Sequence, residues 1–290
     1  MKKLKIRGYQ GVPLAAALFE VKNPRGCVQF VHGLKEHKER YFEFAEFLNG
    51  QGFTVLIADT RGHGESLSRS YPLGYMDGFK KIVEDVSCIN HYLRKRYPGL
   101  PITLFGHSFG SMIARCYLEH HDAEIDKLIM TGTPNFVPIV PVGLAIGLTV
   151  NLVFGKRKYN RLLLWMGDNE GDSSWVNGDP KELAAYLNDY LCTGYRYMNR
   201  SILTIWETDW ELAQVSHFEC KNPELPILSL TGSEDPVAGG LSGVRHTMKT
   251  LGKIGYKDLR FHQYRGFKHE LVNTRGNEKI LEDIACFLKN

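Results

Sequence analysis

The pentapeptide GHSFG at positions 106–110 is the part of the sequence best suited to chemistry. The apolar run ITLF (102–105) leads directly into it, and MIARCYLEH (112–120), which has helical periodicity, follows. A serine on a tight turn between a strand and a helix has its hydroxyl lifted clear of the sheet, where it can attack a carbonyl carbon. We therefore expect Ser108 to be a nucleophile. The alternative is a glycine-rich turn whose serine only caps the following helix.

The neighbours of Ser108 in this motif are expected to shape the turn. Side chains at Gly106 and Gly110 would collide with the neighbouring strand and helix, so glycine is the residue that fits both positions. His107 belongs to the same motif, and we count it with the two glycines as support for the nucleophile.

A serine hydroxyl is a weak nucleophile near neutral pH and needs a histidine base that a carboxylate orients. In a fold with this kind of turn, the acid and then the histidine follow the serine along the chain. Asp235 comes shortly after the apolar run PILSLTG (226–232), where the acid is expected. Glu234 is its rival, but successive side chains of an extended chain point in opposite directions, and Asp-Pro is the better turn former. Asp235 is the predicted acid, and the alternative role for it is helix capping.

Among the 11 histidines, His269 has the position expected of the base. It lies in RGFKHE, after the expected strand DLRFHQY (258–264) and before the last expected helix. His262 falls inside that strand and His246 inside an expected helix, so neither suits the role. The sequence predicts that His269 accepts the serine proton, the alternative being an ordinary surface-loop residue.

The carbonyl oxygen gains negative charge during such an attack, and backbone N–H groups aimed at it would stabilise that charge. One donor should be Phe109, the residue after the nucleophile, and the second should lie in a loop after an early strand. The run CVQFVH (27–32) is followed by such a loop, and Leu34 is its expected donor. His32 and Gly33 would shape the loop, His32 through a structural hydrogen bond.

Short apolar runs alternate with segments of helical periodicity along most of the chain. This alternation predicts an α/β fold with a mostly parallel sheet covered on both faces, after an opening hairpin in residues 1–22. The alternation stops between residues 134 and 223, a stretch too long for a loop. We expect this stretch to be a helical cap inserted into a core formed by residues 1–133 and 224–290.

The most apolar part of the expected cap is FVPIVPVGLAIGLTVNLVF (136–154), and the basic GKRK (155–158) follows it at once. Its length is marginally sufficient to span a bilayer, but its prolines and glycines argue against one straight spanning helix. Residues 136–158 would either cover the active site and pack on the sheet edge, or touch a membrane peripherally. In both cases an apolar lid favours a substrate with an acyl chain over a peptide.

Composition and charge argue against several other classes of function. With 43% hydrophobic and 23% charged residues, the chain has the balance of an ordinary globular protein. A net charge of +4 without a long basic stripe argues against a nucleic-acid partner. The six cysteines form no C-x-x-C pair, and MKKLKIRGYQ at the start lacks the apolar core of a signal peptide. These features predict a cytoplasmic protein with free thiols.

Five separated motifs together resemble the monoacylglycerol lipase and lysophospholipase branch of the α/β hydrolases, which is also grouped with serine aminopeptidase-like hydrolases. The motifs are HGLKEHKERY (32–41), DTRGHGES (59–66), GHSFGS (106–111), TGSEDPV (231–237) and GFKHE (266–270). The resemblance spans nearly the whole expected core, whereas the cap matches only in its placement and apolar character. It implies the α/β-hydrolase fold.

The resemblance also implies a catalytic triad of Ser108, Asp235 and His269, oxyanion donors at Leu34 and Phe109, and neither a metal nor an organic cofactor. Phe109 stands where this branch commonly has Met, and Leu34 where a smaller residue is frequent. Backbone donors survive both changes, so the chemistry should be intact while the shape of the substrate site differs.

The expected reaction is hydrolysis of a small acyl ester, a monoacylglycerol or a lysophospholipid, through an acyl-enzyme on Ser108. Within the same chemistry, a small-ester carboxylesterase, a thioesterase or an aminopeptidase remains open. A protein that keeps this fold as a ligand pocket without catalysis is the alternative from a different class, and the complete set of motifs argues against it.

Overall fold

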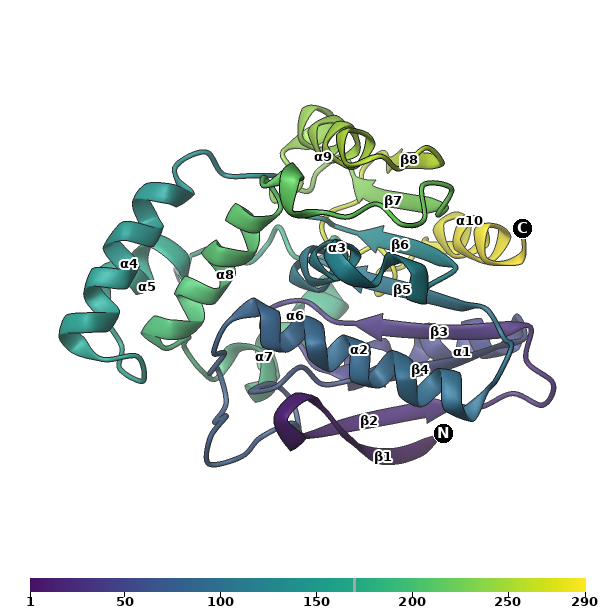
Figure 1. The fold of residues 1–290 in the computed structure, drawn as a ribbon, viewed down its shortest axis with the longest axis horizontal. Coiled ribbons are helices and arrows are strands. Elements are labelled where there is room, and N and C mark those ends of the chain that lie inside the picture. The colour runs from purple at the N-terminus through teal and green to yellow at the C-terminus, as the bar shows by residue number, and fades with distance from the viewer. Residues whose placement is uncertain (169–170) are drawn as a thin grey trace.

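A computed structural model of the protein describes residues 1–168 and 171–290. Within them, eight strands form one sheet in the order β1-β2-β4-β3-β5-β6-β7-β8 (Figure 1). β1 pairs with β2 and β2 with β4 in antiparallel fashion, and all the other neighbours are parallel. The strands are β1 (Lys2–Arg7), β2 (Pro13–Phe19), β3 (Gly26–Val31), β4 (Phe53–Ala58), β5 (Ile102–His107), β6 (Lys127–Thr131), β7 (Ile227–Gly232) and β8 (Leu259–Tyr264).

The central strands explain the continuous apolar runs of the sequence. β3, β4, β5 and β7 are buried along their whole length, as expected for parallel strands covered on both faces. The register aligns Phe30 of β3 with Phe105 of β5, and Phe105 with Ile129 of β6. The carboxyl ends of these strands therefore meet at one edge of the sheet. The predicted α/β fold with a mostly parallel sheet is confirmed.

Helices cover both faces of the sheet. α1 (Phe42–Gly50) and α10 (Glu278–Lys289) share one apolar cluster with the strands. On the other face lie α2 (Phe79–Arg96), α3 (Phe109–His121) and α9 (Gly240–Ile254), which share a second cluster. α2, α9 and α10 each bury one apolar stripe and leave polar residues outside, a pattern visible in the sequence, whereas α3 is buried on all sides over most of its length.

The stretch between β6 and β7, residues 134–223, is called the cap below. Its helices lie beyond one end of the sheet, with α4 and α5 farthest from the strands (Figure 1). α8 contacts both α2 and α3 and so connects the cap to the core. The cap helices in the described residues are α4 (Val140–Phe154), α5 (Arg161–Gly167), α6 (Pro180–Asn188), α7 (Tyr190–Thr193) and α8 (Asn199–Glu211).

The apolar segment of the cap forms the single helix α4. A proline is tolerated in its first turn, where backbone N–H groups have no partner within the helix. Gly143 and Gly147 face Trp206 and Leu203 of α8, and their missing side chains let the two helices approach closely. α4 therefore packs mainly on α8, whereas one interpretation of the sequence placed it on the sheet edge. Over residues 1–168 and 171–290, no helix combines the length and hydropathy needed to cross a bilayer.

Candidate active site

The turn at Ser108 joins β5 directly to α3. Ser108 has φ 52° and ψ −123°, a backbone conformation that few residues other than glycine adopt. Its N–H donates to the carbonyl oxygen of Thr131 in β6 at 2.9 Å, and Ser111 Oγ donates to its carbonyl oxygen at 2.5 Å. These bonds hold the serine at the carboxyl edge of the sheet, where its side chain borders a cavity.

Two glycines allow this turn to fit between its neighbours. A Cβ on Gly110 would lie 2.1 Å from the carbonyl oxygen of Val31 in β3. A Cβ on Gly106 would lie 2.5 Å from the carbonyl oxygen of Gly110 in α3. Both distances are far below van der Waals contact, so the close approach of β3, β5 and α3 requires glycine at the two positions.

Asp235 and His269 meet although they follow different strands. Asp235 comes after β7 and His269 after β8, and the carboxylate oxygen Oδ2 lies 2.9 Å from His269 Nδ1. The other carboxylate oxygen accepts a bond from the Val237 N–H at 2.9 Å. Both side chains are buried, whereas Glu234, the rival acid in the sequence, is exposed. The structure thus joins the predicted acid to the predicted base.

Ser108 and His269 border the same cavity, but within the described residues no hydrogen bond joins Ser108 Oγ to the imidazole. Bonds of this kind are often long in enzymes without substrate and shorten when the reacting complex forms. Leu34 and Phe109 border this cavity too. Four of the five residues predicted to act together therefore border one cavity, and Asp235 is buried behind His269.

The surroundings shift the pKa values of the buried acid and base. Burial raises the pKa of Asp235, but hydrogen bonds from His269 and from backbone amides outweigh it, so the pKa lies below the usual value. Burial lowers the pKa of His269, but the bond to Asp235 and the charges of Asp235, Glu36 and Glu270 outweigh it, so the pKa lies above the usual value. Burial and the neighbouring His269 lower the pKa of His107 to about 3, which keeps that ring neutral.

The loop after β3 packs directly on the nucleophile. A Cβ on Gly33 would lie 2.9 Å from Ser108 Cβ, so the loop backbone is in contact with the serine. His32 Nε2 accepts a bond from the Thr60 N–H at 2.9 Å, which leaves its Nδ1–H to donate to the carbonyl oxygen of Gly33 at 2.8 Å. His32 thus fastens the loop to the segment after β4.

Within residues 1–168 and 171–290, the backbone amides of Leu34 and Phe109 donate no hydrogen bond to another residue. Phe109 is the first residue of α3, so its N–H has no acceptor within the helix. Leu34 follows Gly33 in the loop, and the next amide, that of Lys35, donates to Tyr197 Oη of the cap at 2.9 Å. Leu34 and Phe109, from separate segments, therefore both border the cavity on which Ser108 opens.

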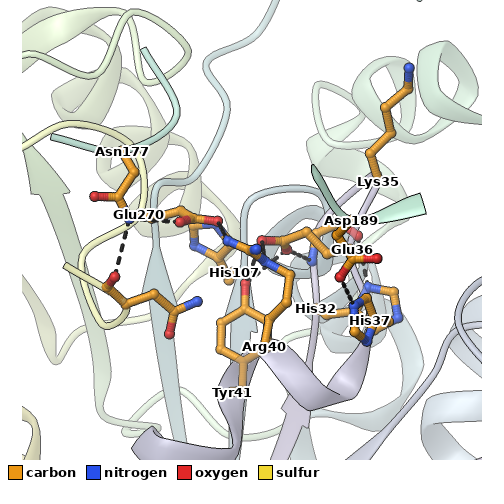
Figure 2. Close-up of polar contacts among 12 residues, drawn as sticks. His32, Lys35, Glu36, His37, Arg40, Tyr41, His107, Asn177, Asp189 and Glu270 are labelled. Carbon is orange, nitrogen blue, oxygen red and sulfur yellow. Dashed lines mark hydrogen bonds and ion pairs between the residues drawn. The ribbon is translucent and has the colours of Figure 1, made fainter. Parts of the chain in front are cut away.

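The sequence did not reveal a buried network of charged residues that includes Glu36, Arg40 and Glu270, the residue after His269 (Figure 2). Glu36 accepts bonds from the Gly33 N–H at 2.7 Å and from Tyr41 Oη at 2.8 Å, so it braces the loop after β3 from within. Arg40 Nη2 lies 2.5 Å from Glu270 Oε1, and Arg40 Nε lies 3.8 Å from Glu36 Oε1. One guanidinium thus stands between two carboxylates.

The cap completes this network. Asn177 Nδ2 donates to Glu270 Oε2 at 2.8 Å and to the carbonyl oxygen of Asn273 at 3.1 Å. The Glu270 N–H donates to the carbonyl oxygen of Val176 at 2.9 Å. The segment that carries His269 is therefore held between the cap and the loop after β3. The motifs HGLKEHKERY and GFKHE contain these charged residues, but the sequence alone does not indicate which of them contact each other.

The cavity has a volume of about 840 Å³ and lies between the cap and the carboxyl edge of the sheet. This size suits a small organic ligand. Met112 of the core and Val140 and Trp206 of the cap give one part of its wall an apolar character. Two groups of three potential metal ligands occur in the described residues, and neither contains a residue of the predicted triad.

The amino-acid sequence matches a family model described as "Serine aminopeptidase, S33" over residues 22–275. It is 24% identical over 272 residues to a monoacylglycerol lipase of Mycolicibacterium smegmatis, covering 92% of this chain and 89% of that protein. It is 27% identical over 260 residues to the human monoglyceride lipase, covering 86% of this chain and 76% of that protein.

The fold is similar to the crystal structure of a thermostable carboxyl esterase from Bacillus coagulans in complex with glycerol. The TM-score is 0.89 at 28% sequence identity, over 99% of this chain and 97% of that one. A monoacylglycerol lipase from Paleococcus ferrophilus has the same fold, with a TM-score of 0.75. The chain is thus an ester hydrolase of the α/β-hydrolase fold, and it belongs to the serine aminopeptidase S33 family, in the branch that resembles monoacylglycerol lipases and lysophospholipases.

Proposed function

We propose that the protein hydrolyses carboxylic esters through an acyl-enzyme on Ser108. The observation that carries this proposal is the 2.9 Å contact between His269 and Asp235 on the cavity that Ser108 borders. His269 takes the hydroxyl proton as Ser108 attacks the ester carbonyl and then gives it to the leaving alcohol. A water molecule, activated by the same histidine, attacks the acyl-enzyme and releases the acid. Asp235 holds the imidazole in the required tautomer and stabilises the imidazolium.

The amides of Leu34 and Phe109 are proposed to bind the oxyanion of both tetrahedral intermediates. Preorganised donors of this kind each contribute about 3–4 kcal/mol to transition-state stabilisation. The strained backbone of Ser108 supports this role, because it turns the hydroxyl out of the sheet while keeping the following amide at the start of α3.

The proposed substrates are esters of acyl lipids, either monoacylglycerols or lysophospholipids. The named activities of the relatives support this class, as does the partly apolar wall of the cavity. A small-ester carboxylesterase is the second candidate, favoured by the similarity to the Bacillus coagulans carboxyl esterase. In both cases the cap, residues 134–223, acts as the lid over the cavity.

We further propose that the outer side of the cap touches lipid surfaces. In α4, Leu148 is 58% exposed, Leu152 87% and Phe154 58%, and Trp165 of α5 is 70% exposed. Exposed apolar side chains of this size next to the basic segment 155–158 are typical of a surface that lies on a bilayer. Such a contact would bring the lid to the source of a lipid ester.

A fluorophosphonate probe tests the nucleophile. We expect one labelled serine per chain and no labelling in Ser108→Ala, with the variant still folded by circular dichroism. A hydrolysis panel of monoacylglycerols, lysophospholipids and p-nitrophenyl esters of graded chain length then assigns the substrate. Labelling that persists in Ser108→Ala would refute the proposed mechanism, and a preference for the shortest esters would favour the carboxylesterase.

A further inference from the structure

A second cluster of reactive side chains lies outside the cavity, where the cap meets the loop after β3. His37 of that loop has a carboxylate on each ring nitrogen. Nδ1 lies 2.7 Å from Glu39 Oε2. Nε2 lies 2.7 Å from Asp189 Oδ2 (Figure 2). The histidine is 6% exposed. Glu39 belongs to the core and Asp189 to the cap, so this imidazole bridges the two.

Helix α7 adds a thiol to the cluster. Asp189 is the N-cap of α7, where its Oδ1 accepts a bond from the Leu191 N–H at 2.8 Å. Cys192 follows three residues later, a spacing that puts both side chains on the same side of one helical turn. One ligand atom from each of His37, Asp189 and Cys192 lies within 4.8 Å of the others. A nitrogen, an oxygen and a sulfur donor thus converge from two segments.

This set of donors has the chemistry of a zinc site. Zn²⁺ takes imidazole nitrogen, carboxylate oxygen and thiolate sulfur in tetrahedral arrangements. A histidine that binds zinc usually donates its second ring N–H to a carboxylate, and Glu39 already holds that position on Nδ1 of His37. A second cavity of about 750 Å³ is lined by His37, Glu39 and Asp189, so two of the three donors border it and Cys192 lies buried beside them.

Cys192 is a buried free cysteine, and a cysteine binds a metal ion as the thiolate. A bound divalent ion would stabilise the thiolate, and its binding would therefore release the thiol proton to solvent. Arg40 is the opposing charge nearby, but Glu270 and Glu36 lie on the two sides of its guanidinium.

We propose that His37, Asp189 and Cys192 bind Zn²⁺ or another thiophilic divalent cation, which fastens helix α7 of the cap to the loop after β3. The ion replaces the proton between His37 Nε2 and Asp189 Oδ2, which is released to solvent together with the thiol proton, and a water molecule completes the tetrahedron. None of the three ligands borders the cavity of the ester-hydrolase site, so the ion takes no part in that reaction. Its effect is to fix the position of the cap on the core.

Titration of the metal-free full-length protein with Co²⁺ tests the proposal without any activity assay. We expect one Co²⁺ per chain, the intense visible bands of tetrahedral coordination and a near-ultraviolet charge-transfer band from a cobalt–thiolate bond, all abolished by excess Zn²⁺. Cys192→Ala should lose the charge-transfer band, whereas Cys220→Ala, at a half-buried cysteine elsewhere in the cap, should keep it. Glu39→Gln should weaken binding about 10–100-fold, as expected for loss of the carboxylate that orients a ligating histidine.

Two outcomes would overturn the proposal: no thiolate band in the unmodified protein at millimolar Co²⁺, or a band of unchanged intensity in Cys192→Ala. Asp189→Asn provides a second variant of nearly the same shape, and its affinity for Co²⁺ should fall. Circular dichroism of each variant separates a lost ligand from a lost fold. Because the readout is an absorption band, failure of the proposed ester hydrolysis would leave this result unaffected.

Discussion

Arg40 and Glu270 are 230 positions apart in the sequence, and their side chains form an ion pair with 2.5 Å between Nη2 and Oε1. The Arg40 side chain is 9% exposed and that of Glu270 2%, so water screens their charges little. The pair connects the loop that carries Leu34 to the segment that carries His269. The two predicted halves of the active site are thus joined by one buried contact.

Replacing Glu270 should change the pH dependence of the enzyme. His269 must be neutral to accept the serine proton, so activity should fall as pH drops below its pKa, which lies above the usual histidine value. The charge of Glu270 contributes to that rise. Glu270→Gln removes the charge at nearly constant shape, and the acid limb of kcat/KM should move to lower pH. Profiles of kcat/KM against pH for a soluble ester would measure the shift.

Glu234→Gln is the matched control for this experiment, because Glu234 is exposed and next to the proposed acid. Its acid limb should stay close to that of the unmodified enzyme. A limb that stays in place or moves to higher pH in Glu270→Gln would show that Glu270 does not act on His269 through its charge.

An alanine at Gly33 should impair catalysis without unfolding the protein. The added Cβ would lie 2.9 Å from Ser108 Cβ and 2.7 Å from Glu36 Oε2, so the loop that presents the Leu34 amide must move. If that amide is an oxyanion donor, kcat should fall about 10²–10³-fold, with little change in KM. Gly50→Ala is the control, since a Cβ there meets nothing within 4 Å. Equal kinetics for the two variants would rule out the proposed donor.

Breaking the ion pair between Arg61, in the segment after β4, and Asp85 should lower the free energy of unfolding of the protein. Arg61 Nε and Nη2 each lie 2.6 Å from a carboxylate oxygen of Asp85, and the Arg61 side chain is fully buried. Arg61→Met would leave the Asp85 charge buried without its partner, which typically costs about 3–5 kcal/mol of unfolding free energy. Urea denaturation of Arg61→Met, of Asp85→Leu and of the double variant would measure the coupling. The double variant should lose less stability than the sum of the single losses.

The outer side of the cap should determine lipid binding if the proposed contact exists. Leu152→Glu places a charge at the most exposed apolar position of α4 and should reduce co-sedimentation with anionic vesicles several-fold. Leu67→Glu, at a 40% exposed leucine in the core, should bind as the unmodified protein does. Hydrolysis of a soluble ester should be the same in both variants. Unmodified protein that stays in the supernatant with such vesicles would contradict the proposed contact.

Much of the core could be predicted because each of its elements carries its own pattern. The strand before GHSFG and the strand before Asp235 are short apolar runs, and α2 and α10 show apolar residues at helical spacing. The acid and the base could be placed because their positions follow from the order of strands and helices. The catalytic roles of Ser108, Asp235 and His269 stay predictions, which the variants described above test.

The polar networks could not be predicted in this way. His37 and Asp189 are 152 positions apart, and their contact depends on how the cap folds back over the core. In the cap, α5 and α7 are short and α4 is apolar along nearly its whole length, so the sequence indicated only a helical insertion. The position of α4 could not be predicted from the sequence either, because it depends on how Gly143 and Gly147 pack against Trp206 and Leu203 of α8.

The cap separates the proposed catalytic residues along the chain. Ser108, Leu34 and Phe109 precede it, whereas Asp235 and His269 follow it. A polypeptide cut within the cap would therefore yield one fragment with a nucleophile and no base, and another with a base and no nucleophile. Neither piece would carry the whole proposed set, and β6 and β7, which lie on the two sides of such a cut, pair in the sheet. The proposed hydrolysis therefore depends on the two halves of the chain being held together.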